Sequence, residues 1–331
     1  MMTEIGQDIE RAVALLKAGE LVAFPTETVY GLGADAMNPA AVAKIFAVKG
    51  RPADHPVIVH LPDATHLSRW ARELPPEAAL LAEKFWPGPL TLILKRHPDV
   101  PDLVTGGQDS VGLRVPNHPL ALRLLKAFGS GIAAPSANKF GRISPTTAQH
   151  VKDDLGEAVP LILDGGPCEV GIESTIVDLT HRRAVILRPG RISADELGRV
   201  LGRNPLSPDD PLAPAELAST RASGMLAAHY APKTPLALMP DDSLPIALRN
   251  ALVRKERVAV LATHPAPFEM PGVIWREAPA DPAGFAHELY ANLRALDAMG
   301  VDRIYVQKPV GAKWLAVLDR LQRAAAGSGE V

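Results

Sequence analysis

Over its first two hundred residues the chain alternates between stretches with the spacing of amphipathic helices and short apolar runs typical of buried strands. Ile9 to Ala18 has helical spacing, and Leu21 to Phe24 has the pattern of a buried strand. Asn38-Pro39 offers an N-cap and a first helical position for a second helix. The other predicted strands are Val57–His60, Leu90–Leu94, Val111–Arg114, Ile132–Ala134, Leu161–Leu163, Ser174–Asp178 and Val185–Leu187. The other predicted helices are Pro76–Phe85, Pro119–Phe128, Pro145–Val151 and Ala194–Leu201. This alternation predicts an α/β domain with a large, twisted, mixed sheet and flanking helices.

The pattern is interrupted after Gly202, where residues 204–211 are rich in proline and acid without periodicity, as in a semi-rigid linker. Beyond it, the predicted strands are Leu236–Leu238, Val258–Ala262 and Arg303–Val306, and the predicted helices are Ser243–Arg254, a long one from Asp281-Pro282 and Ala312–Arg323. We therefore predict an α/β domain over 1–202, a linker over 203–232 and a smaller Rossmann-like α/β domain over 233–331. The small domain lacks a G-x-G-x-x-G turn, so nothing supports dinucleotide binding there.

Composition narrows the class of protein. A length of 331 residues agrees with two domains. The net charge of −2 argues against a protein that bulk electrostatics holds to nucleic acid, although a local basic groove stays compatible with it. Cys168 is the single cysteine, which excludes internal disulfides and cysteine-based zinc sites. Without a signal segment or a run of about 18 apolar residues, we expect a soluble, cytoplasmic protein with no membrane and no stable nucleic-acid partner.

Positive charge is concentrated in the turn from Lys49 to Pro56, directly after a predicted helix. Lys49, Arg51 and His55 lie in this turn, whose backbone Pro52 and Pro56 restrict. A fixed group of cations suits an anion such as phosphate. The alternative is that cations favour the negative end of the helix dipole, which fits Lys49 better than Arg51 or His55.

Polar residues follow other predicted strands as well. Pro25–Gly33 contains two threonines, a carboxylate and two glycines, which suit either a small polar ligand or local capping of the backbone. In Pro135–Thr147, Ser144-Pro145 predicts a helix N-terminus, which offers N–H groups to an anion. Arg114 is the last residue of a predicted strand. Its planar guanidinium can bind a carboxylate with two hydrogen bonds, or it can form an ordinary surface ion pair. His60 ends an apolar strand, where a satisfied core histidine is the commoner case.

No single motif identifies a reaction, because there is no P-loop, nucleophile elbow or paired-histidine metal motif. The joint pattern of hydroxyls, arginines and small residues at strand ends suits a phosphate together with a small zwitterion. Without a candidate nucleophile, catalysis would depend on positioning and charge stabilisation, as in phosphoryl or nucleotidyl transfer.

Taken in order, these segments resemble the YrdC/Sua5 family. The matching residues are Pro25 to Leu32, Lys49-Gly50-Arg51-Pro52, Pro135-Ser136-Ala137-Asn138, Ser144-Pro145-Thr146 and Glu173-Ser174-Thr175. Gly224-Met225 and His229-Tyr230-Ala231-Pro232 resemble the linker of the family's long form, which carries a C-terminal Sua5 domain. The resemblance implies a nucleotidyltransferase that condenses L-threonine, bicarbonate and ATP to threonylcarbamoyl-adenylate and pyrophosphate. The product would pass to a tRNA threonylcarbamoyl transferase machinery.

The resemblance also implies the residues of the site. L-Threonine would contact Thr28, His60, Arg114, Ala134 and Ser174, with its carboxylate on Arg114. ATP would contact Arg51, His55, Ser110, Ser136, Ser144, Arg188 and Tyr230, with Tyr230 covering the nucleotide from the linker. Lys49 and Arg51 would be the catalytic residues beside the phosphates. Mg²⁺ would arrive with ATP and be held through phosphates and water, so no protein metal site is expected.

The linker departs from the family pattern, which has Ser-Pro-Gly-Met where this chain has Ala222-Ser223-Gly224-Met225. The missing proline is expected to loosen this segment. Two alternatives to the synthase stay open. One is an RNA-binding module that has a local basic groove and performs no nucleotidyl transfer. The other is carbamoyl transfer as in hydrogenase-maturation proteins, which the absence of their zinc-finger and acylphosphatase-like modules disfavours.

Overall fold

The computed structural model describes residues 3–214, 220–267 and 270–329. The chain forms two compact units. Unit 1 consists of Met1–Phe140, Pro145–Glu169 and Glu173–Met225, and unit 2 of Gly141–Ser144, Val170–Ile172 and Leu226–Val331. Two short segments that precede residue 202 therefore belong to unit 2. The domain boundaries predicted at 202 and 232 stay predictions.

Unit 1 is built on a ten-stranded sheet in the order β1-β8-β2-β3-β7-β4-β6-β5-β9-β10. Its parallel pairs include β4 with β6 and β5 with β9, and its antiparallel pairs include β2 with β3 and β5 with β6, so the sheet is mixed as predicted. The strands are β1 (Glu4–Gly6), β2 (Val22–Phe24), β3 (Gly31–Asp35), β4 (Val59–His60), β5 (Leu90–Lys95), β6 (Ser110–Arg114), β7 (Ile132–Ala133), β8 (Leu161–Leu163), β9 (Thr175–Asp178) and β10 (Val185–Arg188).

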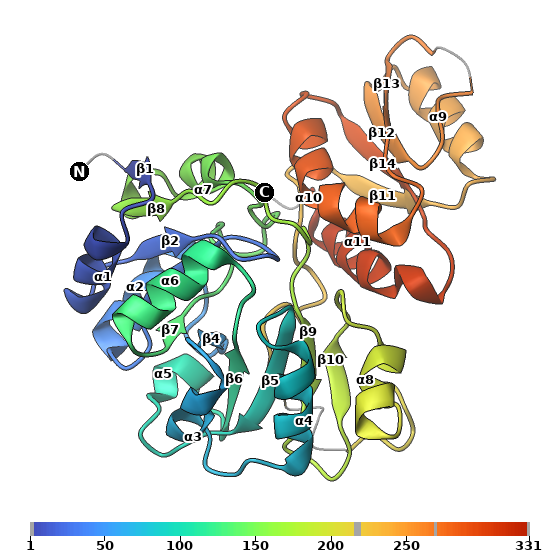
Figure 1. Ribbon diagram of the computed structural model, residues 1–331. Helices are drawn as coiled ribbons and strands as arrows, with labels where there is room; N and C mark the ends of the chain where they lie inside the picture. The colour runs from blue at the N-terminus through green and yellow to red at the C-terminus, as the bar shows by residue number, and fades with distance from the viewer. Residues whose placement is uncertain (1–2, 215–219, 268–269, 330–331) are drawn as a thin grey trace. The chain divides into compact units, whose positions relative to one another are not determined.

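Helices cover the two faces of this sheet unequally (Figure 1). The helices are α1 (Ile9–Lys17), α2 (Pro39–Lys49), α3 (Leu67–Trp70), α4 (Pro76–Phe85), α5 (Asp102–Thr105), α6 (Pro119–Phe128), α7 (Ala148–Leu155) and α8 (Ala194–Leu201), with 3-10 turns η1 (Ala64–His66) and η2 (Gly156–Ala158). α1 and α6 pack on one face, and α2, α4, α7 and α8 contribute to the larger core on the other.

Among the described residues, one part of the α1–α6 face packs without a helix. There, Ile58, Ile93 and Ile176 pack with Leu206. Ala213, Ala222 and Met225, from the chain after α8, pack against the same cluster. Leu206, Ala213, Ala222 and Met225 of the predicted linker thus pack on the sheet, and the linker belongs to unit 1 only as far as Met225.

Unit 2 contains a four-stranded, fully parallel sheet in the order β11-β14-β12-β13. The strands are β11 (Leu236–Met239), β12 (Val258–Ala262), β13 (Val273–Glu277) and β14 (Arg303–Gln307); the helices are α9 (Leu244–Val253), α10 (Pro282–Asp297) and α11 (Leu315–Gly327), with the 3-10 turn η4 (Ala312–Trp314). α9 packs on alternate residues of β12, and α10 and α11 lie side by side (Figure 1). This confirms the second α/β domain.

The helix starts test the capping predictions. Asn38 caps α2 as expected, because its side chain accepts hydrogen bonds from the N–H groups of Ala40 and Ala41. The prediction that Ser144-Pro145 opens a helix was wrong: α7 begins at Ala148, and Thr147 is its N-cap. The Pro145 carbonyl instead accepts a hydrogen bond from the Tyr30 N–H, which holds residue 145 in the loop rather than in a first helical turn.

Candidate active site

Polar residues at alternate positions of four neighbouring strands share the α1–α6 face of the sheet. His60 of β4 lies opposite Arg114 of β6 in the parallel pair. Thr91 of β5 and Ser174, just before β9, place their hydroxyl oxygens 2.8 Å apart. Because side chains alternate along a strand, these residues point away from the large core, to which Leu90, Leu92 and Leu94 point.

Arg114 forms a buried ion pair with Glu27. The Arg114 Nη2 to Glu27 Oε1 distance is 2.8 Å, and the side chains are 5% and 3% exposed. Arg114 Nε donates to the Gly88 carbonyl at 3.3 Å, and Glu27 Oε2 accepts from the Asn117 N–H at 2.9 Å. Glu27 therefore neutralises and orients the guanidinium, whose remaining edge is available to a ligand carboxylate.

His60 is an uncharged group in this site. Burial, and next the Arg114 charge, lower the pKa of its ring to about 3. The ring packs edge-on against Phe24 with centroids 5.8 Å apart. Thr28 is fully buried and shares a 2.8 Å hydrogen bond with the Thr26 hydroxyl, which also donates to the Val29 carbonyl. Ala134 lies beside this group, with its N–H donating to the Ile58 carbonyl.

Lys49 is buried at the end of α2 with its ammonium on backbone oxygens. Nζ donates to the carbonyls of Ser136 and Asn138, each at 2.5 Å. Burial, and next the neighbouring Arg51, lower the pKa of Lys49 well below its ordinary value. This contact shapes the loop that carries Ser136. The assignment of Lys49 to the phosphates stays a prediction.

Arg51 and His55 flank the ring of Phe140. The Arg51 guanidinium carbon lies 5.6 Å from the ring centroid, and the His55 ring meets it edge-on at 5.5 Å. Arg51 Nη2 donates to the Pro56 carbonyl at 2.9 Å. Burial, and next the Arg51 charge, lower the pKa of His55. Of the residues predicted to bind phosphate, Arg51 is thus a cation held in place, and His55 beside it favours the neutral form of its imidazole.

Arg188, at the end of β10, connects Ser174 to the linker. Nε and Nη2 donate to the carbonyl and hydroxyl oxygens of Ser174 at 3.0 and 3.1 Å, and Nη1 donates to the Ser223 carbonyl at 2.8 Å. Gly190 allows this approach, because a Cβ there would lie 2.4 Å from the Thr175 nitrogen.

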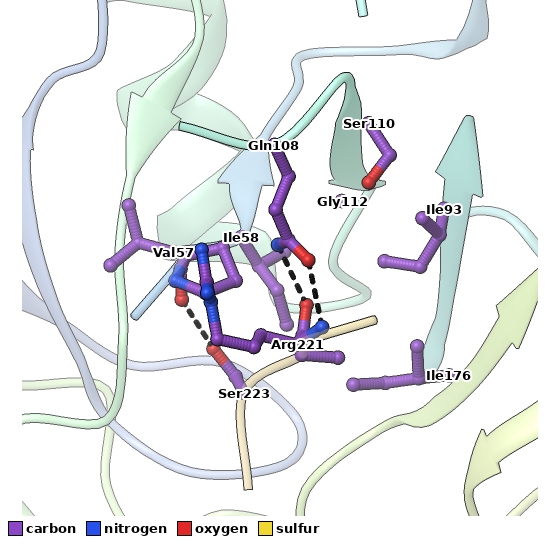
Figure 2. Close-up of a pocket in the computed structure, with 11 residues that line it drawn as sticks. Val57, Ile58, Ile93, Gln108, Ser110, Gly112, Ile176, Arg221 and Ser223 are labelled. Atoms are coloured by element: carbon purple, nitrogen blue, oxygen red, sulfur yellow. Dashed lines mark hydrogen bonds between the residues drawn. The ribbon is translucent and has the colours of Figure 1, made fainter. Parts of the chain in front are cut away.

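The linker covers the end of the site nearest Arg51 and Arg188. The Ser223 hydroxyl donates to the Pro56 carbonyl at 3.1 Å and lies 3.5 Å from Arg51 Nη2. Gln108 exchanges two hydrogen bonds with the Arg221 backbone, and Ser110 lines the same small pocket (Figure 2). The serine in place of the family's proline therefore makes hydrogen bonds that a proline side chain could not make.

The remaining two predicted residues, Ser144 and Tyr230, belong to unit 2. The Ser144 carbonyl accepts a hydrogen bond from Arg294 Nε at 3.4 Å. Tyr230 is buried, and its ring stacks on Tyr290 with centroids 5.7 Å apart.

Within unit 1 the structure brings five of the predicted residues into one series, together with Thr91 and Ser223. The series runs His60, Arg114, Thr91, Ser174, Arg188, Ser223 and Arg51. Sequence reasoning missed three of the participants. Glu27, the partner of Arg114, was considered only as a possible ligand contact in its motif. Thr91 was the polar residue of an apolar strand, and Ser223 was considered only as a missing proline. For Thr91, strand alternation was a usable signal.

A metal-binding group of three or more His, Cys, Asp or Glu side chains does not occur among residues 3–214, 220–267 and 270–329. A magnesium ion that came with a nucleotide would take its ligands mainly from phosphates and water, and the arginine- and hydroxyl-lined site would fit such an ion. Across the same described ranges, each helix is either too short or too polar to span a bilayer.

Comparison with family models gives two adjacent matches. Residues 14–190 match the Sua5–YciO–YrdC model, described as "Telomere recombination". Residues 192–326 match a model described as the C-terminal domain of threonylcarbamoyl-AMP synthase.

Individual relatives match over nearly the whole chain. The threonylcarbamoyl-AMP synthase of Pyrococcus abyssi is 39% identical over 96% of this chain and 94% of its own length. That of Bacillus subtilis is 41% identical over 96% and 93%. The crystal structure of Pyrococcus abyssi Sua5 complexed with L-threonine matches with a TM-score of 0.87 at 36% identity, covering 99% of this chain and 98% of that one.

Proposed function

The chain belongs to the YrdC/Sua5 family in its two-domain form, and from this premise we propose that it is a threonylcarbamoyl-AMP synthase. The observation that carries the proposal is the set of buried polar side chains on one face of the sheet, His60, Arg114, Thr91, Ser174 and Arg188, with the partly buried Ser223 between Arg188 and Arg51. Such a series suits one small zwitterion and one phosphate-bearing substrate held side by side. The relatives support this reading over an RNA-binding module.

L-Threonine occupies the Arg114 end. Its carboxylate takes the free edge of the guanidinium, which Glu27 holds in one orientation. The neutral His60 ring can share a hydrogen bond with threonine without repelling its ammonium group. Thr28, Ala134 and Ser174 complete the binding pocket, and Ser174 also contacts Arg188, so the two substrates share one residue.

ATP occupies the end lined by Arg51 and Arg188. Both guanidiniums now contact the linker through Ser223, and phosphate oxygens replace these contacts when ATP binds. His55, Ser110 and Ser136 contribute to the same end, and Lys49 supports it. Ser144 and Tyr230 are the other two residues that the family pattern assigns to ATP. Mg²⁺ enters with the nucleotide and neutralises phosphate charge.

The reaction consists of two displacements that need no protein nucleophile. The threonine ammonium first releases a proton to water; the neutral amine then attacks the bicarbonate carbon, a C–O bond breaks, water leaves, and a carbamate forms. A carbamate oxygen then attacks the α-phosphorus of ATP; the bond from that phosphorus to the bridging oxygen breaks, and pyrophosphate leaves with the electron pair. Arg51 stabilises the negative charge that develops on the phosphates, and the site supplies proximity by holding both substrates in it. The adenylate is the form in which a tRNA threonylcarbamoyl transferase would take the product.

The test is an incubation of the full chain with ATP, Mg²⁺, labelled bicarbonate and single amino acids. We expect a labelled adenylate and pyrophosphate only with L-threonine. Arg51→Ala lowers the rate at least about a hundredfold, because a charge-assisted contact to the reacting phosphates is lost. ATP hydrolysis without threonine dependence, or RNA binding with a steep salt dependence and no turnover, would refute the proposal.

A further inference from the structure

The two predicted ATP contacts of unit 2 are held by one face of α10. Tyr290, Arg294 and Asp297 follow each other at spacings of four and three residues, which places them on the same side of the helix. Each of them contacts one of two segments, the loop Gly141–Ser144 or the stretch from Tyr230 to Thr234. Both segments and α10 lie within unit 2.

Arg294 holds the loop. Its Nη2 donates to the Ile143 carbonyl, and its Nε donates to the Ser144 carbonyl at 3.4 Å. These carbonyls belong to consecutive residues, so one planar guanidinium constrains the peptide that carries Ser144. A lysine ammonium is a point donor and lacks the fork that fits both oxygens.

The other two residues hold the stretch that carries Tyr230. The Tyr290 ring stacks on the Tyr230 ring at an interplanar angle of 29°. The Asp297 carboxylate accepts hydrogen bonds from the N–H groups of Thr234 and Lys233 at 2.8 and 3.0 Å. Tyr230 has a φ of 60°, which is unfavourable for a non-glycine residue and persists only where surrounding contacts impose it.

The two segments are also bonded to each other. The Ala231 N–H donates to the Gly141 carbonyl at 2.8 Å, and Arg142 Nη1 donates to the Pro232 carbonyl at 3.5 Å. Ser144 and Tyr230 are therefore fixed relative to one another by α10 and by this direct pairing. Among the contacts described above, the hydrogen bond from the Arg294 guanidinium is the one that reaches the carbonyl of Ser144 itself.

We propose that Arg294 is a positioning residue for ATP, which acts by holding the Ser144 peptide in register with Tyr230. The inference rests on the proposed function, because that function assigns both residues to the nucleotide. It gives the C-terminal domain a role: one face of its helix α10 holds the two residues of unit 2 that the proposed function assigns to the nucleotide. Threonine binding does not depend on this face, because Thr28, His60, Arg114, Ala134 and Ser174 all lie in unit 1.

The test compares Arg294→Ala and Arg294→Lys with the control Arg257→Ala in the full chain. Arg257 is matched, because its guanidinium also donates to two backbone carbonyls of unit 2, those of Gly300 and Met299. Calorimetry with α,β-methylene-ATP and, separately, with L-threonine measures the two affinities. Initial rates then separate the KM for ATP from kcat.

For Arg294→Ala we expect the Kd of the ATP analogue and the KM for ATP to rise about tenfold, because two charge-assisted hydrogen bonds are lost. The threonine Kd stays within about twofold, Arg294→Lys recovers about half of the loss on a logarithmic scale, and Arg257→Ala matches the wild type.

An unchanged analogue Kd in folded Arg294→Ala overturns the inference, and so does an equal loss of threonine affinity. If that variant does not fold, Arg294→Lys provides the test instead: it must raise the Kd of the ATP analogue about threefold and leave the Kd of threonine unchanged. A wild type that binds the analogue but makes no threonylcarbamoyl-adenylate refutes the proposed function instead. The two failures are thus distinguishable.

Discussion

Glu27→Gln tests whether Glu27 serves as the built-in counter-ion of Arg114. The substitution keeps the shape of the side chain and an acceptor for the Asn117 N–H, but it removes the negative charge 2.8 Å from the guanidinium. Because both side chains are at most 5% exposed, water cannot replace that charge. Breaking a buried pair costs about 3–5 kcal/mol, and we expect about 3 kcal/mol here because the amide oxygen still accepts. In a domain of this size that lowers the melting temperature by roughly 6–12 °C.

L-Threonine should reverse part of this loss. At a hundred times its Kd, a ligand stabilises the folded state by about 2.7 kcal/mol in any protein that binds it. In the variant, the threonine carboxylate also supplies the missing counter-charge to Arg114, so its stabilisation should exceed that in the wild type. L-Threoninol, which lacks the carboxylate, should not show this excess.

Thermal and urea unfolding, with and without each ligand, measure the effect. The control is Glu20→Gln, whose partner Lys44 lies at the same 2.8 Å distance with side chains 44% and 42% exposed. It should change stability by no more than about 1 kcal/mol. Equal threonine-induced shifts in Glu27→Gln and wild type would contradict the placement of the carboxylate on Arg114. Wild-type stability of Glu27→Gln would contradict the counter-ion argument.

Two further predictions concern His60 and Ser223. The folded-state pKa of His60, about 3, lies below the unfolded value near 6.5, so the unfolded chain binds one more proton between these pH values. His60 alone should therefore lower the free energy of unfolding by about 1.4 kcal/mol per pH unit as the pH drops from 6 towards 4. Urea unfolding of His60→Asn should show a pH dependence of stability that is smaller by this contribution. Ser223→Ala removes the hydroxyl that contacts Arg51 and the Pro56 carbonyl, so ATP displaces the linker more easily. The KM for ATP should fall about threefold in steady-state assays with the KM for threonine unchanged; a rise would show that this contact assists binding instead.

Local patterns were sufficient for most of the framework. The Asn38 cap, the apolar strands and the break in periodicity after Gly202 predicted a mixed sheet followed by a second α/β domain, and both are present. Short strands escaped detection for physical reasons. β3 (Gly31–Asp35) begins Gly-Leu-Gly, which suits a loop equally well, and the three residues of β1 (Glu4–Gly6) are too few to show a period.

The site shows where local reasoning ends. Ser144-Pro145 and Thr147 both have side chains that suit a helix start. The choice between them depends on Tyr30, more than a hundred residues away, whose N–H donates a hydrogen bond to the Pro145 carbonyl. Ser144 was therefore selected for the wrong local reason. The family resemblance selected the same residue. In the structure, Arg294 of the C-terminal domain donates a hydrogen bond to the carbonyl of Ser144. Arg294 carries no motif and sits within an ordinary amphipathic helix, so nothing in its sequence neighbourhood separates it from a solvated arginine. Its role follows from contact across about 150 residues of chain, which only the folded structure provides.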